Sequence, residues 1–131
     1  VDINTGRIIH KKKFFSEIKP VIINNYLFTV SKNNLLISMD LVDGKILYSY
    51  NINQKISEFL NIKKKAVEFK EIMIVNDKIF IFLKNSYLLI FNIRGSLEDV
   101  RNLPSKIKSQ PIFIDNSLLY LDFKNKLTIV N

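Results

Sequence analysis

PVIINNYLFTVSKNNLLISMD, the segment at residues 20–40, holds three apolar stretches separated by two polar turns. The same 21-residue pattern aligns without a gap with residues 72–92 and 111–131. The first turn of each copy is a polar pair: Asn24 and Asn25, Asn76 and Asp77, or Asp115 and Asn116. Asn and Asp tolerate the positive φ that tight reversing turns require. The repeat therefore predicts three antiparallel strands per unit.

A fourth strand is expected after an Asp-x-x-x-Gly turn, which occurs at residues 2–6 and 40–44 and in a shorter form at 92–95. Residues 7–10 and 45–50 have strand composition, whereas 96–100 are more polar and fit a weaker strand or a loop. Equivalent acidic or amide landmarks at 2, 40, 92 and 131 are separated by steps of 38, 52 and 39 residues. The middle unit is therefore longer by about 13 residues.

The extra length fits a short helical or loop insertion at residues 53–65. We expect Asn53 to cap a helix over 54–60, with Ile56, Phe59 and Leu60 on one face, before the basic run at 63–65.

A repeat of about 40 residues with four antiparallel strands is typical of a β-propeller blade. The expected fold is all-β: a propeller segment of about three four-stranded antiparallel blades. We expect one partial domain over residues 1–131, with units near 1–38, 39–90 and 91–131, that belongs to a longer chain. Open sheet edges would make this segment marginal or prone to aggregation in isolation.

Composition excludes several classes of protein. The 131 residues include no Cys, which removes disulfide scaffolds, thiol catalysis, zinc ribbons and iron–sulfur sites. The net charge of +8 accompanies 21 Ile, 15 Asn and 17 Lys but one Ala, a usage typical of AT-rich codons. We therefore attribute most of the charge to codon bias. The longest apolar runs have about five residues, far below the roughly 20 of a membrane-spanning helix.

Two segments carry a family resemblance. MDLVDGKILY at residues 39–48 and VDINTGRIIH at residues 1–10 resemble the pyrroloquinoline-quinone-like propeller repeat, with Tyr48 and His10 at the aromatic position. A third copy at 91–95 is degraded. The chain is most similar to the outer-membrane β-barrel assembly lipoprotein branch of that family. This resemblance implies a periplasmic, cofactor-free scaffold that binds other proteins, including the assembly machinery, and touches the membrane only through a lipid anchor outside this segment.

The enzymatic branch of the same family, the quinoprotein dehydrogenases, is the alternative. A quinone site requires a flat ring held by an aromatic such as Trp, and calcium requires converging oxygen ligands. The chain has no Trp and no acidic cluster beyond its turns. We therefore expect no enzyme and no catalytic, cofactor-binding or metal-binding residue. A basic nucleic-acid-binding module is a third hypothesis, based on the lysine runs at 11–13 and 63–65, and we expect no nucleic-acid partner.

Other conspicuous residues have structural interpretations. His10 is the only histidine, so no histidine pair or catalytic triad can form, and we expect it to pack between blades. Asp2, Asp40 and Asp43 recur with glycine, as turn residues do. Gly6, Gly44 and Gly95 are isolated, which excludes a Gly-rich phosphate loop. The strand aromatics are expected to pack between blades: Phe28, Phe80, Phe82, Phe91 and Tyr120.

Overall fold

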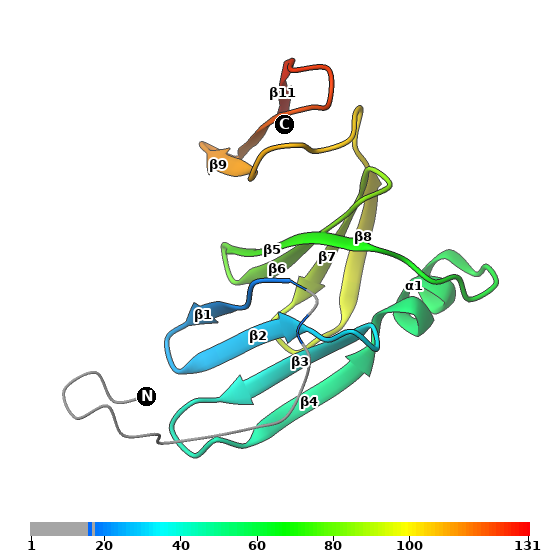
Figure 1. Ribbon diagram of the computed structural model, residues 1–131. Coiled ribbons are helices and arrows are strands. Elements are labelled where there is room, and N and C mark those ends of the chain that lie inside the picture. Colours follow the sequence, from blue (N-terminus) through cyan, green and yellow to red (C-terminus); the bar gives the residue numbers. More distant parts are fainter. Residues whose placement is uncertain (1–15, 17) are drawn as a thin grey trace.

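A computed structural model describes residue 16 and residues 18–131 of the chain (Figure 1). The expected strand at 7–10 and the residues Asp2, Gly6, His10 and 11–15 lie outside this part. The first sheet contains β1 (Val21–Ile23), β2 (Tyr26–Val30), β3 (Leu35–Asp40) and β4 (Ile46–Asn51). Helix α1 (Ile52–Leu60) follows β4 directly.

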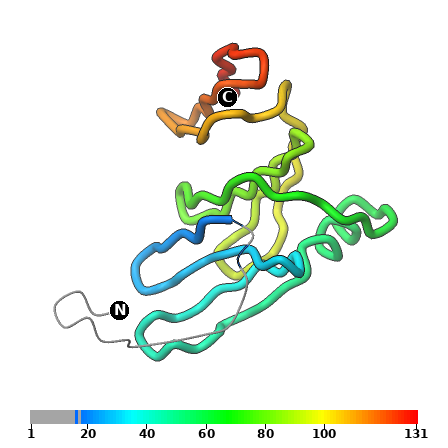
Figure 2. Tube along the Cα trace, viewed as in Figure 1, coloured from blue at the N-terminus to red at the C-terminus, as the bar shows by residue number. Residues whose placement is uncertain are grey.

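Two further sheets complete the described part of the chain. The second contains β5 (Phe69–Val75), β6 (Lys78–Leu83), β7 (Tyr87–Asn92) and β8 (Leu97–Asn102). The third contains β9 (Ile112–Ile114), β10 (Ser117–Leu121) and β11 (Leu127–Val130). The tube in Figure 2 passes through the three sheets in sequence order, with the third at the opposite end from the first.

All three sheets are antiparallel meanders, in which each strand pairs with its neighbour in the sequence. This topology confirms the all-β fold class of a partial propeller. The polar segment after the degraded turn is a full strand, β8, which pairs with β7 along its length. The landmarks Asp40 and Asn92 end the third strand of their sheets, so a unit counted between landmarks combines strands of two successive sheets.

The predicted polar pairs occupy the hairpin turns between the first two strands of each sheet. Five of these six residues, all but Asn25, have positive φ angles, which Asn and Asp tolerate. The second turn of each sheet also has one residue with positive φ, at Asn34, Ser86 or Asn125. The angles in the first turns are 52° at Asn24, 49° at Asn76, 59° at Asp77, 48° at Asp115 and 66° at Asn116.

The middle sheet is buried on both faces. Side chains of β6 and β7 at odd positions, such as Ile79, Ile81 and Phe91, pack in one core cluster with Phe28 and Leu36 of the first sheet. Even positions pack in a second cluster with the third sheet, and these are Phe82, Leu88 and Ile90. A strand that alternates side chains between two buried faces has no polar face. This explains why residues 79–83 of β6 and 87–91 of β7 are continuously apolar.

The insertion is helical, as expected, but its cap and its buried face differ from the prediction. Asn51, the last residue of β4, is the N-cap, and its Oδ1 accepts a hydrogen bond from the Gln54 backbone N–H at 3.0 Å. Asn53 lies instead in the first turn, where it is buried. Ile56 packs against the core, whereas Phe59 is 46% exposed and Leu60 is 41% exposed. The strand runs into the helix without a linker, which shifts the cap by two residues and rotates the buried face.

Candidate protein-interaction surfaces

The turn after β3 has the geometry that the Asp-x-x-x-Gly pattern predicts. Asp40 Oδ1 accepts the Val42 N–H at 2.8 Å, and Asp43 Oδ1 accepts the Lys45 N–H at 3.0 Å. Gly44 has φ +72°, and its N–H donates to the Asp40 carbonyl at 2.9 Å. Both carboxylates therefore hold backbone amides of their own turn.

Tyr48, at the aromatic position of the repeat, joins the first sheet to the second. Its hydroxyl donates to the backbone carbonyl of Ile93, in the turn between β7 and β8, at 2.7 Å. Its ring stacks on Tyr50 with centroids 4.9 Å apart. Burial raises the pKa of the Tyr48 phenol. A neutral hydroxyl is therefore kept as the donor to the next unit.

The degraded copy of the turn keeps its structural role. Asn92 Oδ1 accepts the Ser96 N–H at 3.1 Å, and the Gly95 N–H donates to the Asn92 carbonyl at 3.0 Å. Gly95 has φ +86° and lies against the rings of Tyr50 and Tyr48. The sequence identified Tyr48 but not Tyr50. Tyr50 lies on β4 and is 37% exposed, and nothing in the local sequence indicates that its ring stacks on Tyr48.

A groove of about 530 Å³ lies between the second and third sheets. Phe80 and Phe113 form its apolar part, with ring centroids 5.0 Å apart. Two ion pairs line the same groove, Lys78 with Glu98 at 2.6 Å and Arg101 with Asp99 at 2.8 Å. The hydrogen bond from Lys78 lowers the pKa of Glu98. The Glu98 carboxylate therefore stays charged at neutral pH.

A second groove, of about 370 Å³, lies beside Tyr48, Tyr50 and Arg94, between the first sheet and the second. Aromatic and arginine side chains are enriched in protein interfaces, where an apolar centre is surrounded by polar groups. Both grooves therefore have the composition of protein-binding surfaces.

The described residues do not fit a quinone and calcium site. Within them, no group of three or more His, Asp or Glu side chains is placed to hold a metal ion. Asp40 and Asp43 are committed to their turn, and the sequence offers no Trp to cover a quinone ring. The predicted strand aromatics pack in the core, where Phe28, Phe82 and Phe91 are fully buried and Tyr120 is 2% exposed. Phe80 is half-buried in the groove.

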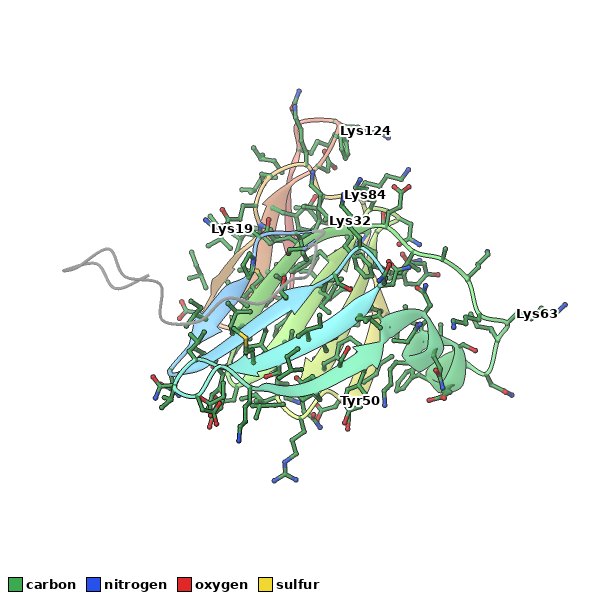
Figure 3. The ribbon with its side chains drawn as sticks, turned by 60° about the horizontal axis from the view of Figure 1, so that its bottom comes forward. Lys19, Lys32, Tyr50, Lys63, Lys84 and Lys124 are labelled. Atoms are coloured by element: carbon green, nitrogen blue, oxygen red, sulfur yellow. The ribbon has the colours of Figure 1, made fainter. Side chains whose placement is uncertain are left out.

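Lysines occur in the turns of the first and third sheets, on β5 and β6, and in the loop after α1. In Figure 3, Lys19, Lys32, Lys84 and Lys124 lie toward the top of the view, and Lys63 extends from the loop after α1. Within residues 16 and 18–131, no helix is long and apolar enough to cross a membrane.

The fold defined by these sheets is that of consecutive β-propeller blades. No protein-family model and no curated protein sequence matches the chain. Among solved structures it is similar to BamB from Moraxella catarrhalis, with a TM-score of 0.74 and 15% identity, over 98% of this chain and 36% of BamB. The chain thus spans about a third of the length of BamB.

Two other solved structures share the architecture less fully. One is the quinohemoprotein alcohol dehydrogenase ADHIIG from Pseudomonas putida HK5, with a TM-score of 0.55 and 10% identity, over 84% of this chain and 17% of the enzyme. The other is the computationally designed protein Ika8, with a TM-score of 0.56 and 11% identity, over 84% of this chain and 31% of the design. These likenesses establish the fold and confirm the resemblance to the pyrroloquinoline-quinone-like propeller at the level of structure.

Proposed function

We propose that this chain is part of a non-catalytic scaffold that binds other proteins in the assembly of outer-membrane proteins. The observation that carries the proposal is the similarity to BamB, the outer-membrane assembly lipoprotein, over 98% of the chain at a TM-score of 0.74. The dehydrogenase aligns over a smaller share and with a lower score. On the basis of the same resemblance we also propose that the protein acts in the periplasm, held at the outer membrane by a lipid anchor.

The surface chemistry supports protein binding. The groove between the second and third sheets combines two aromatic rings with two ion pairs. Such a surface offers an apolar centre with charges at its margin, which is the usual anatomy of a protein interface. We give the nucleic-acid hypothesis less weight, because the lysines are spread along the sequence from residue 11 to residue 126 rather than concentrated in one segment.

Photo-cross-linking in the cell that makes this protein tests the proposal. A photoreactive lysine analogue at Lys78, in the groove, should form adducts with components of the outer-membrane assembly machinery, identified by mass spectrometry. The same analogue at Lys124, in the turn before β11, is the matched control and should form few adducts. If Lys78 forms no protein adduct, or no more than Lys124, the proposal is wrong.

The second candidate is a portion of a quinoprotein dehydrogenase, which the similarity to ADHIIG favours. Titration of the chain with pyrroloquinoline quinone and Ca²⁺, followed by the absorbance of the quinone ring, separates the two. We expect no saturable change, whereas a shift with a micromolar midpoint would favour the enzyme.

A further inference from the structure

A third cavity lies beside α1, away from the two grooves described above. It has a volume of about 180 Å³ and is formed by α1, the segment that follows the helix, the β6–β7 turn and β8. This volume is below the roughly 300–1,000 Å³ of sites for drug-sized ligands. The cavity therefore suits a single inserted side chain better than a whole small molecule.

The walls of the cavity are mostly apolar. Ile62, which belongs to this lining, is 50% exposed, and Phe59, beside the lining residue Leu60 in the sequence, is 46% exposed. The insertion adds about 13 residues to the repeat, and no strand of the three sheets comes from it. Besides Ile62, the aliphatic lining residues are Ile56, Leu60, Val67, Leu83, Leu89 and Val100.

One buried polar atom in this lining has no partner. Asn53 is 7% exposed, and its Oδ1 makes no hydrogen bond within the described part of the chain. A buried acceptor without a donor is unfavourable, and a ligand that supplies an N–H removes this penalty. A peptide backbone carries such a donor at nearly every residue.

The mouth of the cavity is positively charged. Lys63 and Lys65 line it, and Lys64 lies between them in the sequence. All three are exposed, and none belongs to an ion pair among the described residues. Figure 3 shows Lys63 extending from this loop into solvent. The surface around the cavity is therefore complementary to carboxylates.

We propose that this cavity is the docking site for an acidic, extended peptide segment of a partner protein. One leucine-sized side chain of the segment fills the cavity, a backbone N–H beside it donates to Asn53 Oδ1, and flanking carboxylates pair with Lys63 and Lys65. This inference rests on the proposed protein-binding function and names where, and what chemistry, the scaffold recognises.

Three synthetic peptides test it by titration of the ¹⁵N-labelled 131-residue chain, followed by NMR: acetyl-Asp-Glu-Leu-Glu-Asp-amide, its neutral analogue acetyl-Asn-Gln-Leu-Gln-Asn-amide, and acetyl-Asp-Glu-Ala-Glu-Asp-amide. The acidic leucine peptide should shift the Asn53 side-chain amide and the Leu60 backbone amide. The neutral peptide and the alanine peptide should each bind at least five-fold more weakly.

Matched variants locate the site. Lys63→Glu/Lys65→Glu should weaken the acidic leucine peptide at least ten-fold. Lys124→Glu/Lys126→Glu has the same spacing and the same change in charge at a distant turn, and it should leave the affinity within two-fold. Asn53→Leu removes the acceptor while keeping an apolar group of similar size, and it should weaken binding several-fold.

Several results would overturn the inference. They are equal loss in the two double variants, equal affinity of the neutral peptide, absence of binding at millimolar peptide, or concentration-dependent shifts at Asn53 and Leu60 without peptide, which would indicate a second copy. Cross-links from Lys78 that persist when the peptide does not bind leave the scaffold function standing and remove only this docking site. If Lys78 forms no cross-links to other proteins in the cell, the scaffold function itself is refuted.

Discussion

Gly95→Ala should destabilise the packing of the first sheet against the second. Gly95 has φ +86°, a conformation that L-residues rarely adopt. A Cβ at this position would lie 2.6 Å and 2.7 Å from Cδ2 and Cε2 of Tyr50, and 2.9 Å from Cε1 of Tyr48. These rings stack on each other, and Tyr48 is also held by its hydrogen bond to Ile93. The rings must therefore move together to admit a methyl group.

Two contributions set the size of the effect. A left-handed conformation costs an L-residue about 1–2 kcal/mol. Overpacking that displaces neighbouring side chains typically costs about 1–3 kcal/mol. The variant should therefore lose about 2–5 kcal/mol of unfolding free energy, a large share of the roughly 5–15 kcal/mol that stabilises a typical domain.

Urea unfolding of the dilute chain, monitored by circular dichroism, measures the loss. A double-mutant cycle with Tyr50→Ala separates the two contributions, because removal of the ring relieves most of the overpacking but leaves the backbone strain. Gly95→Ala should then cost about 1–3 kcal/mol less in the Tyr50→Ala background. A loss below about 1 kcal/mol in the wild-type background, or an equal loss in both backgrounds, would refute the reasoning.

Three further predictions concern stability and association. Burial raises the folded-state pKa of Tyr48, so the contribution of Tyr48 to folding stability is complete below the ordinary tyrosine pKa of about 10 and is lost as pH rises above it. In a plot of urea midpoint against pH, Tyr48→Phe should therefore flatten the alkaline limb, and an unchanged limb would contradict this. Backbone N–H groups of the β10–β11 turn lower the pKa of Asp122, so the contribution of Asp122 to folding stability is present above a pH of about 4 and is lost as pH falls through the folded-state pKa. Asp122→Asn should flatten the acid limb of the same plot, and a steeper limb would be evidence against this role of Asp122. Leu127 and Ile129 are 62% and 59% exposed on β11, so Leu127→Lys/Ile129→Lys should lower the average mass of the isolated chain in light scattering, while a wild-type chain that is already monomeric would contradict the expected self-association.

The sequence was sufficient for the strands and their hairpins because these depend on local chemistry. Asn76 and Asp77 carry the positive φ angles that such residues predict, and both lie between two apolar runs. The continuous runs of β6 and β7 follow from burial between two neighbouring sheets, which the repeat implies once the blades are stacked.

Features that depend on contacts between residues far apart in the sequence could not be predicted from local chemistry. Asn51 and Asn53 are equivalent candidates for a helix cap on local grounds, and the pairing of Asn51 with Leu35 at the end of β4 decides between them. The contact of Gly95 with Tyr50 joins residues 45 positions apart in two sheets. The burial of Asn53 beside the basic loop also depends on strands of the second sheet, so it could not be predicted from the sequence around Asn53 alone.

The complete product of the gene, isolated from the cell envelope and characterised by intact mass and peptide sequencing, tests the central claim most directly. A scaffold of outer-membrane assembly should carry a lipid-modified cysteine at its mature N-terminus. Its further blades should resemble those at residues 20–51 and 69–102, without a quinone site. Additional blades that bear Trp and converging carboxylates, in a protein without the lipid, would contradict the account and favour the dehydrogenase.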